Sequence, residues 1–196
     1  MADPVDVLAR EVAACTFCVP HLPLGPRPVT QFSATARILI IGQAPGTKVH
    51  ASGVPWQDDS GDRLRDWTGI APVDFYDAAR VALVPMGFCY PGKGASGDAP
   101  PRPECAPRWH ERILDVLPKD RLTLLVGSYA QDRYLPKDAG KTLLERVQNF
   151  RRFAPSIFPT PHPSWRSVGW QKRNPWFERD LLPELRTAVR AHLGRP

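Results

Sequence analysis

Residues 37–64 read RILIIGQAPGTKVHASGVPWQDDSGDRL, and this stretch decides the fold. It opens with a continuous apolar run at 38–41, which is typical of a strand buried on both faces of a parallel sheet. Gly42 ends the run, and a tight loop follows through Gly46, where the missing Cβ atoms let a ligand approach the main chain. Open α/β sheets bind their ligands in loops of this kind, at the carboxyl ends of strands. The simpler alternative is an ordinary connection between a strand and a helix.

The rest of the chain alternates short apolar runs with segments of helical periodicity. Further strands are predicted at 81–85, 122–126 and 156–160, and a long Gly/Pro loop at 86–104. Helices are predicted at 3–14, 60–67, 72–79, 105–117, 128–135, 141–150 and 174–192. Alternating strands and helices indicate a parallel sheet covered on both faces. We therefore expect one domain over residues 1–196, a three-layer α/β/α sandwich with a central four-stranded parallel sheet.

Charge and hydropathy restrict the class of protein. The net charge is +6 and the pI is about 9.4, a modest bias towards a polyanionic partner. Basic side chains flank the segment around His162, namely Arg151, Arg152, Arg166, Lys172 and Arg173. No apolar run approaches the length of a membrane span, and the first residues lack the apolar centre of a signal peptide. We expect a soluble, cytoplasmic protein with no membrane partner.

The four cysteines form two spaced pairs. They are Cys15, Cys18, Cys89 and Cys105, which give C-x2-C and C-x15-C. In an intracellular chain such a set is unlike a disulfide framework. Four thiolates bind zinc tetrahedrally or hold a four-iron cluster, and spacing alone does not choose between the two. The alternative is four unrelated buried thiols.

A second candidate functional loop follows the predicted strand at 156–160. It reads PHPSWRS over 161–167, so two prolines hold His162 in a stiff, extended segment. Because this loop also leaves the carboxyl end of a strand, it is expected to open on the same edge of the sheet as residues 42–46. Trp165 and Arg166 suit a segment pressed into nucleic acid. The alternative is that Trp165 anchors the loop on the protein body.

These motifs together resemble the uracil-DNA glycosylase superfamily, and specifically its iron–sulfur-containing bacterial and archaeal branches. GQAPG at 42–46 is similar to the first motif of the family, and GVPWQDDSG at 53–61 stands where the family has a glycine, an aromatic residue and a Gly-rich helix start. HPSWR at 162–166 looks like the second motif, and the cysteine spacings match those of the cluster ligands. The resemblance runs from Cys15 to the last helix.

The resemblance implies a role for each matching residue. The four cysteines would hold a structural [4Fe–4S] cluster, with zinc as the less favoured occupant. Trp56 would stack on a flipped uracil, and the backbone near Gln43 and Ala44 would contact the base. His162 would donate a hydrogen bond to uracil O2, and Ser164, Trp165 and Arg166 would fill the gap that the extruded nucleotide leaves.

Three positions depart from the family pattern. Relatives carry a carboxylate at the position of Gln43 or Ala44 and an asparagine near Pro85. Asp58 and Asp59 are the nearest acidic substitutes for positioning water, and a helix lead-in favoured by the helix dipole is their simpler interpretation. We expect base readout led by the backbone at Gln43, Ala44 and Pro85, with tolerance for other deaminated bases.

The resulting functional hypothesis is a monomeric, monofunctional glycosylase that removes uracil from single- or double-stranded DNA in base-excision repair and leaves an abasic site. One alternative is a non-catalytic or product-trapping module that binds uracil or abasic DNA and keeps the cluster. Another is a zinc-stapled α/β protein that binds a small nucleotide.

Overall fold

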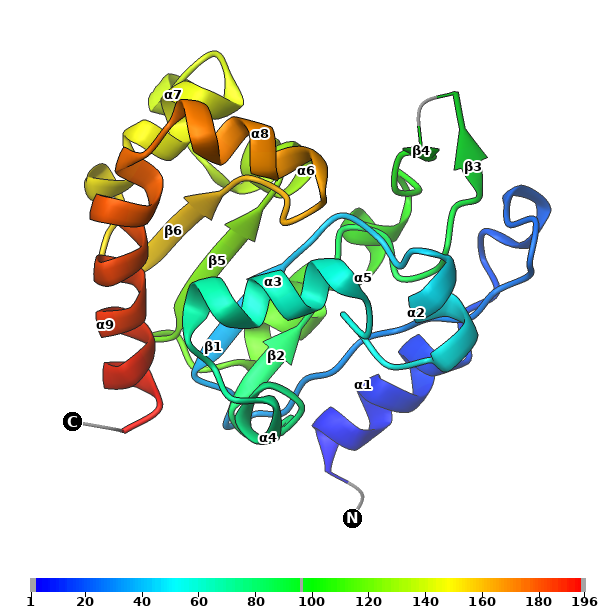
Figure 1. Cartoon of the computed structure of the whole chain (residues 1–196). Coiled ribbons are helices and arrows are strands. Elements are labelled where there is room, and N and C mark those ends of the chain that lie inside the picture. The colour runs from blue at the N-terminus through cyan, green and yellow to red at the C-terminus, as the bar shows by residue number, and fades with distance from the viewer. Residues whose placement is uncertain (1–2, 96, 195–196) are drawn as a thin grey trace.

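The computed structural model describes residues 3–95 and 97–194 and has a four-stranded parallel sheet at its centre (Figure 1). The strands are β1 (Ile38–Ile41), β2 (Val81–Leu83), β5 (Leu122–Val126) and β6 (Ile157–Thr160). Their order across the sheet is β2-β1-β5-β6, and every pairing is parallel. The predicted three-layer α/β/α sandwich is confirmed.

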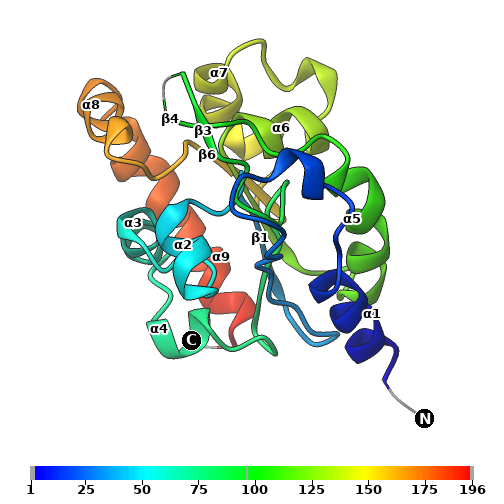
Figure 2. The ribbon, with the colours of Figure 1, turned by 90° about the vertical axis from the view of Figure 1, so that its right-hand side faces the viewer.

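Alternate residues of β1 pack against helices on opposite faces of the sheet. Ile38 and Ile40 belong to one apolar cluster, and Leu39 and Ile41 belong to the other. Helices α3 (Asp59–Thr68) and α9 (Leu182–His192) supply the first cluster, and α1 (Pro4–Ala13), α5 (Cys105–Val116) and α6 (Ser128–Tyr134) supply the second (Figure 2). All four β1 side chains are at most 1% exposed, which is why the strand reads as an unbroken apolar run.

Several elements differ from those expected from the sequence. The helix expected at 72–79 is the single turn α4 (Pro72–Phe75), and the one expected at 141–150 is α7 (Leu143–Gln148) followed by a 3-10 turn at Phe150–Arg152. The expected helix at 174–192 begins with a π-helical stretch, Phe177–Leu181, before α9. Within the described residues, no helix is long and apolar enough to cross a membrane.

Segments that were expected to be loops contain 3-10 turns at Val19–His21 and Lys137–Ala139 and four further helices and strands. They are α2 (Thr47–Ser52), the strands β3 (Lys93–Gly94) and β4 (Gly97–Asp98) of a small antiparallel ribbon, and α8 (Arg166–Arg173). The ribbon strands are exposed, and α2 and α8 each bury one residue, so none of them carries an apolar stripe in the sequence.

The strand order places a topological switch beside β1. The chain passes from β1 outward to β2, then crosses back to β5 on the other side of β1. Connections that leave β1 in opposite directions open a crevice at the carboxyl ends of the strands, where doubly wound sheets bind ligands. The loops at 42–46 and 161–167 both start at this edge.

Candidate active site

A pocket of about 340 Å³ lies at the carboxyl edge of the sheet. Gln43 and Ala44 line it from the loop after β1, Pro85 from the segment after β2, and His162 and Ser164 from the loop after β6. The two motif loops, 120 residues apart, therefore meet at one cavity, as their positions after parallel strands predict. Trp56, Asp58 and Arg166 also line the pocket.

The loop after β1 is held rigidly against the segment after β2. The carbonyl oxygen of Gly42 accepts a hydrogen bond from the backbone N–H of Met86, and that of Gln43 accepts one from Gly87, both at 2.9 Å. These bonds extend the β1–β2 ladder beyond the strand ends. Gln43 and Ala44 thus present a fixed backbone to the pocket. Pro85 lines the pocket from the facing segment, and its side chain has no polar atom.

Trp56 is held in a backbone conformation that few side chains adopt. Its φ is +57°, and it is the one residue other than glycine with positive φ in the described part of the chain. Two glycines make room for it. A Cβ on Gly42 would lie 2.6 Å from Cζ2 of the Trp56 ring, and one on Gly61 would lie 1.7 Å from the Trp56 carbonyl oxygen. The indole is therefore seated directly on the end of β1.

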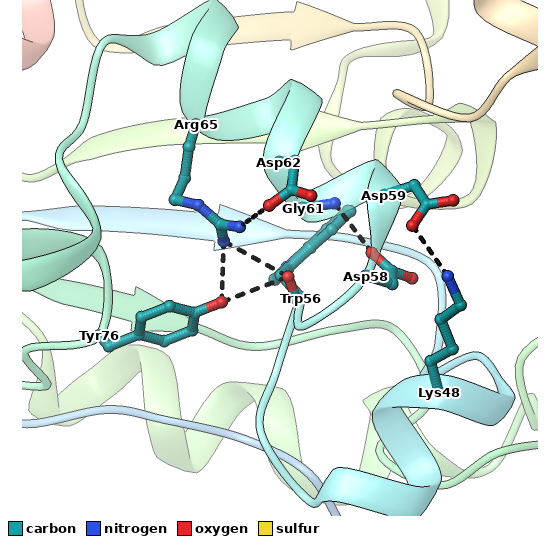
Figure 3. Close-up of polar contacts among 8 residues, drawn as sticks. All are labelled: Lys48, Trp56, Asp58, Asp59, Gly61, Asp62, Arg65 and Tyr76. Atoms are coloured by element: carbon teal, nitrogen blue, oxygen red, sulfur yellow. Dashed lines mark hydrogen bonds and ion pairs between the residues drawn. The ribbon is translucent and has the colours of Figure 1, made fainter.

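Polar side chains fix the same tryptophan from its backbone side (Figure 3). Its carbonyl oxygen accepts hydrogen bonds from Arg65 Nη1 at 3.4 Å and from Tyr76 Oη at 3.3 Å, and Arg65 also donates to Tyr76 at 2.8 Å. Asp62 pairs with the other end of the Arg65 guanidinium. Backbone strain that is over-determined in this way is typical of functional sites.

His162 stacks against Trp56. The ring centroids are 5.8 Å apart and the planes are inclined by 30°. Burial lowers the pKa of His162, and the nearby charges of Asp58 and Asp98 only partly oppose the effect, so the imidazole is neutral at pH 7. Arg63 of α3 donates to the carbonyl oxygen of Pro163 at 2.8 Å and so ties the histidine loop to the helix that follows the first motif.

The two adjacent aspartates have different environments. Asp58 is the N-cap of α3: its Oδ1 accepts a hydrogen bond from the Gly61 N–H at 2.8 Å (Figure 3). It also lines the pocket. Asp59 does not line the pocket; its side chain is 86% exposed and pairs with Lys48 Nζ at 2.8 Å. The structure therefore brings Asp58, and not Asp59, to the candidate site.

Trp165 projects from the protein beside the pocket. It is 74% exposed, and the guanidinium carbon of Arg166 lies 5.4 Å from its ring. The alternative that Trp165 anchors its loop on the protein body is therefore wrong. Ser164 lines the pocket, and α8 begins two residues after it. The last turn of α8 carries Lys172 and Arg173.

The four cysteines gather around one small cavity of about 20 Å³. Burial raises the pKa of Cys89 to about 11 and that of Cys105 to about 12, and the nearby cysteines add to both pKa shifts. The Phe88 N–H donates to Cys105 Sγ at 3.3 Å. Within 3–95 and 97–194, no group of three or more Cys, His, Asp or Glu is arranged as a metal site. The donor set nevertheless fits a thiophilic group, because all four cysteines line one cavity, and Cys89 and Cys105 accept backbone hydrogen bonds there.

Four contributors to the site escaped the sequence analysis. Asp98 lines the pocket from β4, Arg63 holds the histidine loop, and Arg65 and Tyr76 hold Trp56. The arginines lie on a predicted helix, where exposed basic residues are common, so the sequence carries no local sign of their contacts. Asp98 lies in a segment rich in glycine and proline that has no periodicity.

Residues 29–186 match the model of the uracil DNA glycosylase superfamily. The match spans both motif loops, all four strands of the parallel sheet and the first part of α9, as far as Arg186.

Proposed function

Because the chain belongs to the uracil-DNA glycosylase superfamily, we propose that it hydrolyses the N-glycosidic bond of uracil in DNA and leaves an abasic site. One observation carries the proposal. A fixed aromatic ring, Trp56, and a neutral hydrogen-bond donor, His162, stack side by side in a pocket at the carboxyl edge of the sheet. This pair offers a face for a planar base and a donor for the charge that the base acquires.

The chemistry demands that the leaving base be stabilised as an anion. When the N1–C1′ bond breaks, the electron pair moves onto uracil and the sugar becomes cation-like. A donor placed in a water-poor pocket is most effective at the atom where charge develops, and removing one such donor typically costs about 10²- to 10³-fold in rate. His162 meets this requirement as a neutral imidazole, which has one N–H to donate.

Asp58 complements the histidine electrostatically. Its carboxylate lines the pocket and is close enough to act on the His162 charge. An ionised carboxylate stabilises the positive charge of the sugar while the base departs. The N-cap bond from Gly61 fixes its direction, so this stabilisation is preorganised.

Access to the base requires that the nucleotide leave the stack. Trp165 is the exposed aromatic side chain nearest in sequence to the pocket residue Ser164, and Arg166 lies at its ring. An aromatic wedge with an arginine beside it suits the gap that an extruded nucleotide leaves. The basic end of α8 suits the flanking phosphates.

Cys15, Cys18, Cys89 and Cys105 are proposed to hold a [4Fe–4S] cluster. Such a group would supply a covalent tie between the N-terminal segment, the loop after β2 and the start of α5, and no redox step is required of it. Zinc is the alternative occupant, since four thiolates suit it equally well.

A strand-break assay tests the proposed reaction. A labelled single-stranded oligonucleotide with one uracil is incubated with the protein and then heated in alkali, which cleaves abasic sites. Wild-type protein is expected to produce a break at the uracil, and His162→Ala is expected to lose at least about 10²-fold in the single-turnover rate. An unchanged rate in a folded His162→Ala protein would remove the histidine from the mechanism.

A binding module is the second candidate function. Ala44 and Pro85 lack the side chains with which relatives position water and read the base, and this favours it. Tight binding of uracil or abasic DNA without any strand break would establish this function in place of excision. A protein–DNA band that resists SDS would instead indicate a trapped product.

A further inference from the structure

The ribbon β3–β4 brings an unassigned carboxylate into the pocket. Asp98, the last residue of β4, lines the cavity together with its neighbour Ala99. The ribbon belongs to neither motif loop; it lies between Cys89 and the start of α5 (Figure 1). It also reaches the second motif, because a Cβ on Gly97 would lie 3.5 Å from Nη1 of Arg166.

The two oxygens of Asp98 have different surroundings. Oδ1 accepts a hydrogen bond from Lys93 Nζ at 2.9 Å and lies 3.5 Å from Tyr90 Oη. Oδ2 faces the loop after β1, where it lies 3.4 Å from the position that a Cβ on Gly46 would take. The side chain is 36% exposed, so one oxygen is held by the ribbon and the other is open to the pocket and to water.

Asp58, at the start of α3, approaches Gly46 from a different segment than Asp98 does. Its Oδ2 lies 4.0 Å from the position of the same Gly46 Cβ. Two carboxylates therefore flank Gly46, and both act on the charge of His162. A Cβ at residue 46 would occupy the space between them at van der Waals distance from both oxygens, so glycine leaves this space open. A water molecule placed there would have acceptors on two sides.

We propose that Asp98 is the general base that activates the attacking water in the glycosylase reaction proposed above. Asp98 Oδ2 takes a proton from the water while the water oxygen forms a bond to C1′ of the deoxyribose. The N1–C1′ bond breaks and its electron pair leaves with uracil. The abasic sugar, the uracil anion and protonated Asp98 are the products, and Asp98 returns its proton to solvent or to the uracil anion.

The surroundings of the three acidic residues distinguish Asp98 from the others. Asp59 lies outside the pocket and pairs with Lys48. Asp58 caps α3 through its first oxygen, so it is suited to a fixed electrostatic role. Asp98 is on an exposed ribbon at the pocket, where water has access, and Lys93 orients its carboxylate. Asp98 thus supplies the pocket with a carboxylate that the first motif, with alanine at position 44, does not supply.

The decisive variant is Asp98→Asn, which keeps the shape of the side chain and its acceptor for Lys93. It is expected to lose about 10²- to 10⁴-fold in the single-turnover rate of uracil release, the range for a general base. Asp115→Asn is the matched control, because Asp115 is an exposed carboxylate paired with Lys119 on a remote helix. Its rate is expected to equal that of the wild type.

Chemical rescue separates a catalytic role from a structural one. Asp98→Ala is expected to regain activity when formate is added, because formate supplies the missing base. Formate is expected to leave Asp115→Asn unchanged. Rescue would not follow if Asp98 only shaped the ribbon.

The outcomes also separate this inference from the proposed function. An active wild type with an equally active Asp98→Asn overturns the role of Asp98 alone, and so does a loss that formate does not restore. A loss of the same size in Asp58→Asn with none in Asp98→Asn assigns the base to Asp58. A wild type that binds uracil DNA but releases no uracil overturns the proposed function itself.

Discussion

His110 shows how one buried side chain supports the pocket. It is 1% exposed and lies between the rings of Phe88 and Tyr134. Its Nε2 is 2.9 Å from the carbonyl oxygen of Pro85, which can only accept, so Nε2 carries the proton. Nδ1 then accepts from the Tyr134 hydroxyl at 2.5 Å. The neutral imidazole thus fixes the backbone of Pro85, a residue that lines the pocket.

The protonation of His110 should couple stability to pH. Burial lowers its pKa to about 4, from an ordinary value of 6.5. Between these values the unfolded chain binds a proton that the folded protein does not, so stability falls as the pH falls, by up to about 1.4 kcal/mol per pH unit. Below pH 4 both states are protonated and this contribution stops changing.

Urea unfolding at pH 6.5 and 4.5 measures this effect. Between pH 6.5 and 4.5 the free energy of unfolding of the wild type is expected to fall by about 2 to 3 kcal/mol more than that of His110→Gln, because glutamine does not titrate. Other groups contribute equally to both proteins and cancel in the difference. Parallel pH dependence of the two proteins would show that His110 is already protonated, or exposed, in the folded state.

At the scale of elements, α3 organises both motif loops. Its N-cap is Asp58, and its first turn contains Gly61, over which the Trp56 carbonyl packs. Two arginines of the helix then hold separate loops: Arg63 binds the Pro163 carbonyl and Arg65 binds the Trp56 carbonyl. A displacement of α3 would therefore move the aromatic face and the histidine together.

Packing of the Trp56 ring on β1 is testable at Gly42. Gly42→Ala places a Cβ 2.6 Å from the ring, so the indole must shift from its position beside His162. Uracil excision is expected to fall by at least about 10-fold, the effect of a misplaced binding group. Inhibition by free uracil is expected to weaken in parallel.

Gly169→Ala is the control for this substitution. A Cβ on Gly169 meets nothing within 4 Å, and the residue lies inside α8, so alanine is expected to stabilise the helix by about 0.5 to 1 kcal/mol and to preserve excision. Full activity in Gly42→Ala would mean that the ring position is not needed for base binding.

At the scale of the whole molecule, the sheet order and the cysteine cavity bring distant segments together. The carboxyl ends of β1, β2 and β6 supply residues of one pocket. The cysteine cavity is lined by the N-terminal segment, by α5 and by Cys89 and Arg102, which lie on either side of the β3–β4 ribbon in the chain. We therefore expect that unfolding around the cysteines would displace the β3–β4 ribbon and, with it, Asp98.

Loss of one thiol tests whether the cysteines act as a set. Cys105→Ser is expected to lose the absorbance at about 400 nm of a four-iron cluster and to unfold on the order of 10 °C below the wild type. Because burial holds the Cys89 and Cys105 pKa values near 11 and 12, binding of the group should release protons. A colourless wild type with one zinc per chain would identify the alternative occupant. Equal melting of wild type and variant would indicate separate buried thiols.

The sheet was predictable because its physical cause is local. The strands are buried on both faces over most of their length, so they are mainly apolar, and such runs are visible in the sequence at 38–41 and 122–126. Exposed elements such as β3, β4 and α8 have no such requirement, and the sequence did not disclose them. Helix α4 ends after one turn, and beyond it Asp77 Oδ1 accepts a hydrogen bond from the Ala79 N–H, a local turn that competes with continuation of the helix.

The sequence by itself determined the α/β/α class, the family and the two motif loops, because these depend on apolar runs and on residues close together in the chain. Only the tertiary structure decided that Asp58 faces the pocket while Asp59 pairs with Lys48, that Trp165 is exposed, and that Asp98 joins the site. The physical reason is that a side chain's direction and partners depend on how separate elements pack. Neighbouring residues such as Asp58 and Asp59 are chemically identical until α3 is placed against the sheet.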